Sequence, residues 1–197
     1  TLTYNGNSGS YTFGGSNFRT DGDNLVGRSI SGIGYPPKNQ WYRFLYTKNG
    51  SLWINNTKYS SGSGSDRTYG QLSFANTRGV NNRLQGKIGA IFVYNSDLSD
   101  SQVINNYNSY SGRFTTTTGG TTSIITQNLV LALDAATTSS YPGTGTTWYD
   151  LSTSANNGTL INGVGYNSSD GGSLTFNGSN QYITIGSANF PVGYSPG

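Results

Sequence analysis

Short alternating and apolar runs divide the first part of the chain into predicted strands. Residues 40–47 are rich in aromatic and β-favouring types, and 51–54 follow Lys48-Asn49-Gly50, which supplies residues that tolerate the left-handed backbone of a tight hairpin. A second turn at 55–56 leads into residues 57–60. The pattern therefore predicts a three-stranded meander.

Residues 86–94 (Gly-Lys-Ile-Gly-Ala-Ile-Phe-Val-Tyr) form a nearly continuous apolar run. A strand that packs on one side alternates apolar with polar residues, whereas a strand covered on both sides does not. We therefore expect a central core strand, buried between two layers.

The one convincing helix signal begins at Ser99. Ser99 and Gln102 have the spacing of a capping box, in which each side chain bonds the backbone N–H of the other residue. Leu98 and Val103 stand at the two positions of a hydrophobic staple. These signals predict a helix N-terminus immediately after the buried strand.

This helix is expected to be short. Val103, Ile104 and Tyr107 would share one apolar face, and Gly112 would lie just beyond the last turn. A helix near 99–110 has about three turns. We expect it to pack across one end of the sheets.

A linker is predicted at residues 115–122 (Thr-Thr-Thr-Thr-Gly-Gly-Thr-Thr), because these side chains cannot build a core. Strand patterns resume beyond it, at 128–133, 173–176 and 181–185. These later strands lack hairpin partners of their own. We therefore interpret the chain as two parts, residues 1–114 and 123–197, neither of which closes a core alone.

The composition suits a β-rich fold with many turns. Of 197 residues, 32% are apolar and 10% charged, whereas Gly reaches 29 and Tyr 15. His, Cys and Met are absent, and all eight acidic residues are Asp, so disulfides, thiolate zinc sites and thiol nucleophiles are excluded. The chain shows no initiator Met, signal peptide or apolar run near membrane length. We expect a soluble chain without a membrane span, processed or excised from a longer one.

Positive charge is in mild excess, with a net charge of +3, and the Lys and Arg residues are scattered. A nucleic-acid groove needs clustered cations with stacking aromatic rings. Scattered cations are more typical of solvated sheet edges, where they suppress unwanted pairing. We therefore expect no nucleic-acid partner.

Distinctive strings lie on both sides of the linker. Those after it are LVLALDAA at 129–136, SYPGTGTTWYDLS at 140–152, NNGTL at 156–160 and SLTFNG at 173–178. They resemble the opening half of laminin-G-like, concanavalin A-like jelly-roll domains found in bacteriophage and microbial surface structural proteins. Those before it, NQWY at 39–42, NGSLWIN at 49–55 and GKIGAIFVYN at 86–95, resemble the closing half.

The resemblance implies an all-β fold, a two-sheet antiparallel jelly-roll sandwich with one short helix near 99–110. Its halves stand in permuted order, because 1–114 matches the C-terminal half and 123–197 the N-terminal half. Three arrangements fit: a circular permutant, one period of a tandem array, or subunits that complete one another by exchange. We favour association into a filament, by exchange or by tandem repeats, over a lone permutant.

Catalytic residue types are missing. Jelly-roll glucanases of the resembled superfamily use paired Glu residues, and this chain has none. No His or Cys is present for a nucleophilic system. Asp21 and Asp23 lie in a Gly/Asn turn, and Asp97 and Asp100 flank the helix start, where turn-forming and dipole-compensating roles are expected. We therefore expect no enzyme.

The resemblance also implies a candidate Ca²⁺ site, since many laminin-G-like domains hold this ion through Asp side chains and loop carbonyls. The matching positions are Asp134, Asp150, Asn177 and Asn180. Relatives often carry Asp where Asn177 and Asn180 stand, so the local negative charge is reduced here. Asp150 is alternatively a turn-capping residue. Ca²⁺ is the one candidate cofactor.

Carbohydrate binding is a second candidate activity, because lectin sites combine aromatic faces with amides and hydroxyls. The candidate rings are Trp148, Tyr149, Tyr166 and Tyr182. Aromatic residues also pack well on pleated sheets, which is the alternative explanation for each of them. Glycosylation sequons occur at Asn55, Asn157, Asn167 and Asn177.

These observations predict a non-enzymatic structural and adhesive subunit of an extracellular fibre or virion appendage. Its main partner would be itself, assembled head-to-tail through shared sandwich halves, with surface glycans as further partners. The alternative function is a carbohydrate-binding lectin module, acting as a soluble or cell-surface receptor-binding domain.

Overall fold

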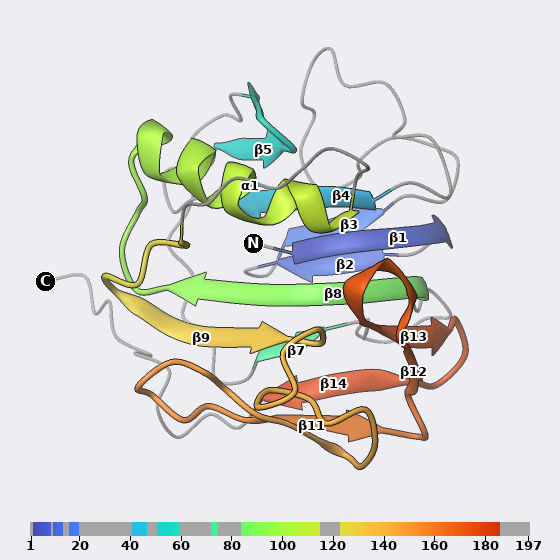
Figure 1. Ribbon diagram of the computed structural model, residues 1–197. Coiled ribbons are helices and arrows are strands. Elements are labelled where there is room, and N and C mark those ends of the chain that lie inside the picture. The colour runs from blue at the N-terminus through green and yellow to red at the C-terminus, as the bar shows by residue number, and fades with distance from the viewer. Residues whose placement is uncertain are drawn as a thin grey trace, which may run out of the picture.

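The structure is a computed structural model, and the residues that it describes are 2–8, 10–13, 16–19, 41–46, 51–59, 72–74, 84–114 and 123–185. In these ranges the chain is mostly antiparallel β-structure with one α-helix (Figure 1). The elements are β1 (Leu2–Ser8), β2 (Ser10–Phe13), β3 (Ser16–Arg19), β4 (Trp41–Tyr46), β5 (Leu52–Ile54), β6 (Thr57–Tyr59), β7 (Leu72–Phe74), β8 (Gln85–Tyr94), α1 (Asp100–Phe114), β9 (Leu129–Asp134), β10 (Thr147–Trp148), β11 (Gly158–Ile161), β12 (Gly165–Asn167), the 3₁₀ turn η1 (Ser169–Gly171), β13 (Ser173–Asn177) and β14 (Tyr182–Ile185).

The strands form a larger and a smaller antiparallel sheet, with β2 and β3 as a separate pair. The larger sheet has the order β12-β13-β8-β1-β4-β5-β6, and β9 also pairs with β8. The smaller sheet has the order β10-β11-β14-β7. The all-β expectation with one helix is therefore confirmed at the level of antiparallel sheets. Within the described ranges, no helix combines the length and apolar character needed to cross a membrane.

Strand β8 is the centre of the larger sheet. One of its edges pairs with β1, so that Ile91 lies opposite Leu2. Its other edge pairs with β13 and then with β9, where Ile91 lies opposite Leu133. Because β8 precedes residues 115–122 and both β9 and β13 follow them, the sheet is built from both parts of the chain.

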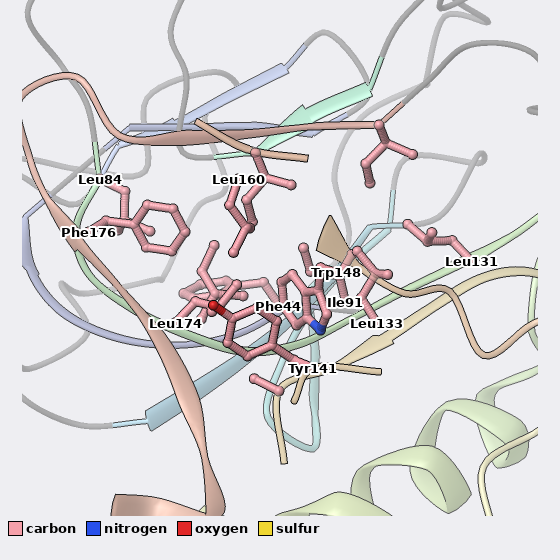
Figure 2. Packing of buried hydrophobic residues seen from close by; sticks show 14 of the residues in the cluster. Phe44, Leu84, Ile91, Leu131, Leu133, Tyr141, Trp148, Leu160, Leu174 and Phe176 are labelled. Carbon is pink, nitrogen blue, oxygen red and sulfur yellow. The ribbon is translucent and has the colours of Figure 1, made fainter. Parts of the chain in front are cut away.

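The main core lies between the two sheets and also draws on both parts of the chain (Figure 2). Its completely buried members include Ile88 and Ile91 of β8, Leu133 of β9, and Ile183 and Ile185 of β14. Burying each such side chain contributes about 1.5–3 kcal/mol. The core therefore depends on residues from both sides of the linker.

The opposite face of the larger sheet is covered by α1, so β8 and β9 are buried on both sides. Phe92 and Ala132 point away from the main core and form a second cluster, against which Tyr110 of the helix packs. The rings of Phe92 and Tyr110 meet edge-on, with centroids 4.9 Å apart. This double burial confirms the expectation from the apolar run at 86–94 and explains why that run does not alternate.

The expected placement of the helix is wrong. Instead of crossing an end of the sheets, α1 lies over β4 and β5 in Figure 1, where Val103 packs against Leu45 and Trp53. The physical reason is the second apolar face of the larger sheet, which needs a cover. Beneath the helix, buried Arg43 donates a hydrogen bond from Nη1 to the Val103 carbonyl at 3.0 Å.

The helix also ends later than expected, at Phe114, and Gly112 lies inside its last turn. Arg113 of this turn is held by contacts to strands below it, which stabilise the extra helical residues. Ile104 is exposed instead of forming part of the inner face. The capping box is confirmed, because the Ser99 N–H donates to Gln102 Oε1 at 2.8 Å and the Gln102 N–H donates to Ser99 Oγ at 3.3 Å.

The predicted meander is confirmed by β4, β5 and β6, which pair in sequence order. Asn55 in its second turn has a positive φ of 55°, a conformation that Asn tolerates better than most residues. The turn at 48–50 lies outside the described residues. After the linker, β9, β13 and β14 match the predicted strands.

Candidate functional site

A polar cluster joins the end of α1 to the end of β9. Its centre is Asp134, whose carboxylate accepts hydrogen bonds from Tyr110 Oη at 2.8 Å, the Ala136 N–H at 2.9 Å and Thr137 Oγ1 at 3.1 Å. The same carboxylate forms an ion pair with Arg113. We call these residues the Asp134 cluster.

Arg113 connects three strands at once. Its guanidinium donates to the Asp134 carboxylate, to the Gly172 carbonyl that precedes β13, and to the Gly89 carbonyl of β8 at 3.4 Å. The Arg113 and Asp134 side chains are only 14% and 9% exposed, so little water screens their attraction. Planar guanidinium groups suit such multiple contacts better than a lysine ammonium group does.

Tyr110 is held in its neutral form. Burial raises the pKa of its hydroxyl, and the neighbouring Asp134 carboxylate raises it further. The protonated hydroxyl is the state that can donate to Asp134, so the local electrostatics favour the observed hydrogen bond. The cluster is therefore suited to holding two elements together.

A second cluster fixes the residues that follow the linker, and we call it the Asn106 cluster. Buried Asn106 accepts from the Ile125 N–H at 2.7 Å through Oδ1 and donates to Tyr94 Oη at 2.9 Å through Nδ2. Tyr94 Oη in turn donates to the Ile125 carbonyl at 2.8 Å. Asn105 Nδ2 donates to the Ser123 carbonyl at 2.9 Å. Both backbone groups of Ile125 are thus bound by side chains from before the linker.

The predicted Ca²⁺ ligands occupy two separate places. Asp134 lies opposite Ala90 on β8, whereas Asn177 lies opposite Gln85, five residues away along the same strand. This separation corresponds to about 17 Å, which is far beyond the reach of one ion. The four residues therefore do not form a single ligand set. Asn177 Oδ1 instead accepts the Ser179 N–H at 2.8 Å and closes its own turn.

Asp150 has the turn-capping role that was the alternative to Ca²⁺ binding. Its carboxylate accepts from the Ala132 N–H at 2.7 Å, the Asn156 N–H at 2.8 Å, and both the N–H and Oγ of Ser152 at 2.9 and 2.7 Å. Asn180 lies in the turn between β13 and β14 and contacts the Asn177 side chain. Within the described ranges no group of three or more His, Cys, Asp or Glu residues comes together.

The four aromatic candidates differ in exposure: one ring is completely buried, one is half-buried and two are exposed. Trp148 is completely buried in the main core, beside Phe44 and Tyr141 in Figure 2, and Tyr182 is half-buried against the same core. Tyr149 and Tyr166 are 46% and 37% exposed. Tyr149 and Tyr166 are therefore the most accessible of the four rings, because the core covers the Trp148 ring and part of Tyr182.

The sequon residues all take part in local turns. Asn55 Oδ1 accepts the Arg43 N–H at 3.0 Å, Asn157 Oδ1 accepts the Asp150 N–H at 2.9 Å, and Asn167 Oδ1 accepts the Ser169 N–H at 2.7 Å. Asn177 closes the turn described above. Asn157 and Asn177 are exposed, whereas Asn55 and Asn167 are half-buried.

The Asp134 and Asn106 clusters were missed by the sequence analysis. Asn106, Tyr110 and Arg113 have the spacing i, i+4, i+7, which places them on one helix face. They continue the helix stripe that begins at Val103. Polar residues that extend a buried apolar stripe indicate buried hydrogen bonds, and this pattern was the available signal for the two clusters. Asp134 at the end of a buried strand was a second signal, since buried carboxylates require partners.

No family model, curated protein or solved structure matches this chain.

Proposed function

We propose that this chain is a non-enzymatic structural and adhesive subunit of an extracellular fibre or virion appendage. In this proposal its two parts are halves of a laminin-G-like, concanavalin A-like jelly-roll sandwich, and copies associate head-to-tail by sharing those halves. The two sheets with one core between them support the sandwich interpretation.

The observation that carries the proposal is the composition of the larger sheet around β8. Among the described residues before the linker, β8 has a partner on one edge only, and its other edge is paired with β9 and β13 from after the linker. An unpaired central edge is a template for strand addition, which joins chains through main-chain hydrogen bonds. A heterologous contact of this kind repeats into a filament when it does not close.

Electron microscopy of the concentrated chain tests the proposal. Within one chain, the linker holds the second part near the first at an effective concentration on the order of millimolar. The chain should therefore be refolded at about 1 mM, so that association between copies can compete with closure within a chain. We expect linear particles of uniform width. Isolated particles of single-chain size in every field would contradict the fibre function.

A lectin module is the second candidate, favoured by the exposed rings of Tyr149 and Tyr166. A glycan array with and without Ca²⁺ tests it. Selective binding that is lost in Tyr149→Ala or Tyr166→Ala, and kept in a variant at half-buried Tyr182, would support sugar recognition. If no glycan is bound selectively, the lectin function is refuted and the structural function remains.

A further inference from the structure

We infer that the inner face of α1 and the β9/β13 edge of β8 form an acceptor surface for residues 123–185 of a second copy of this chain. This inference rests on the proposed function and names the partner and the contacts of the shared fold. The acceptor surface consists of Asn105, Asn106, Tyr110 and Arg113 of the helix together with β8.

The contacts on this surface fix the register of the incoming residues. Both backbone groups of Ile125 are bound by the Asn106 cluster, and the Asn95 N–H donates to the Asn128 carbonyl at 2.9 Å. Strand β9 then pairs with β8 through main-chain bonds, and Asp134 meets Arg113 at its end. A segment held at its start, along its length and at its end is recognised in one alignment only.

These contacts do not require that the two parts belong to one chain. Asn105 Nδ2 contacts the Ser123 carbonyl, and Asn105 precedes Phe114 by nine residues, or about 14 Å along the helix axis. The eight residues 115–122 can extend to about 27 Å. A connection of twice the necessary length permits closure within a chain, and it also permits the same contacts with a neighbouring copy.

The choice between the two closures depends on concentration, because both form the same contacts. A linker of this length favours closure within the chain until the protein concentration approaches the effective concentration, on the order of millimolar. Closed chains must release the second part before they can exchange it. Refolding at about 1 mM is therefore the condition under which the acceptor surface takes residues from a second copy.

A pair of cysteine substitutions can distinguish the two closures. Lys87 on β8 lies opposite Thr175 on β13, and both are half-buried and outside the main core. Directly opposed residues in antiparallel strands have Cα atoms about 4.5–5.5 Å apart, within the range of a disulfide. The chain has no cysteine of its own, so each new thiol is unique.

The experiment mixes full-length Lys87→Cys chains with isotope-labelled full-length Thr175→Cys chains, refolds them together at about 1 mM and then oxidises them. The inference predicts labelled–unlabelled dimers of twice the 20.9 kDa chain mass as a major product on non-reducing mass analysis. A mixture of Thr147→Cys and Thr159→Cys chains is the matched control. These residues face each other on β10 and β11, both after the linker, so exchange keeps them in the same chain.

The double variant Lys87→Cys/Thr175→Cys shows that the geometry allows the bond, because it forms the disulfide in either closure. If this variant is oxidised and the mixed chains give no more dimer than the Thr147/Thr159 control, the inference is overturned. Linear particles without the Lys87–Thr175 link between chains would refute the acceptor surface and leave the fibre function standing. If the Lys87–Thr175 link between chains forms but only closed dimers are found, the acceptor surface stands and the fibre function is refuted.

Discussion

Replacing Arg113 by methionine removes the positive charge from the Asp134 cluster and leaves its carboxylate buried. The remaining donors, from Tyr110, Ala136 and Thr137, are neutral. Removing one partner of a buried pair costs about 3–5 kcal/mol, because the other charge stays uncompensated. Since the two side chains are only 14% and 9% exposed, we expect Arg113→Met to lie within this range. That loss is a large fraction of a typical stability of about 5–15 kcal/mol.

Urea denaturation followed by the fluorescence of the three Trp residues measures this loss. With m near 1–3 kcal/mol/M, a loss of about 3–5 kcal/mol should lower the urea midpoint by about 1–5 M. Arg113→Lys should lose less, about 1–2 kcal/mol, because it keeps the charge but cannot reach Asp134, Gly172 and Gly89 together. The double variant Arg113→Met/Asp134→Asn should be more stable than the sum of the two single losses implies, since both charges are gone.

The control is the exposed ion pair between Lys58 and Asp100, whose side chains are 39% and 61% exposed. Asp100→Asn should cost about 0–1 kcal/mol, as surface ion pairs usually do. An Arg113→Met loss no larger than the Asp100→Asn loss would refute the reasoning that the Asp134 cluster holds the two parts of the chain together.

Three further predictions follow from other features of the structure. Ser173 Oγ is buried and finds no hydrogen-bond partner among the described residues, so Ser173→Ala should raise the unfolding free energy by about 1 kcal/mol. Ser140→Ala removes two hydrogen bonds and should lower the unfolding free energy by about 1–2 kcal/mol. Chemical denaturation of both variants compares them. Burial raises several tyrosine pKa values above 10.0, so the tyrosine contribution to stability should be constant below that pH and fall as pH rises past it. Burial also lowers the pKa of Arg43 to about 10, which opposes the fall. A denaturation series across pH 10 would contradict the prediction if stability rose throughout. Deleting six of the eight residues 115–122 leaves three Cα–Cα steps between Phe114 and Ser123, a reach of about 10 Å for a distance of about 14 Å. Light scattering should therefore show multimers in place of single chains, and a purely monomeric deletion variant would contradict the assigned contacts.

Local signals in the sequence were sufficient for the elements that form from neighbouring residues. The meander from β4 to β6 pairs in sequence order, and the start of α1 is fixed by the capping box of Ser99 and Gln102. Strand β8 was recognisable because burial on both faces removes the polar alternation. In these cases the residues that determine the structure are close together in the chain.

The remaining features of the fold depend on contacts between residues that are far apart in the sequence. The strands β10, β11 and β12 have only two to four residues each, too few for an alternating pattern to be recognised, so their pairing partners determine them. Arg113 extends the helix past Gly112 only because Asp134 lies beneath it, and no local pattern contains that partner. The candidate Ca²⁺ ligands also depend on long-range pairing, since strand register places Asn177 and Asp134 at different positions along β8 and does not bring them together.

The native mass of the chain after refolding at about 1 mM and dilution tests the central claim most directly. If copies complete one another's sheets, light scattering should find stable species at multiples of 20.9 kDa, because separating them requires β9 and β13 to leave β8. A single species of 20.9 kDa after the same treatment would contradict the account.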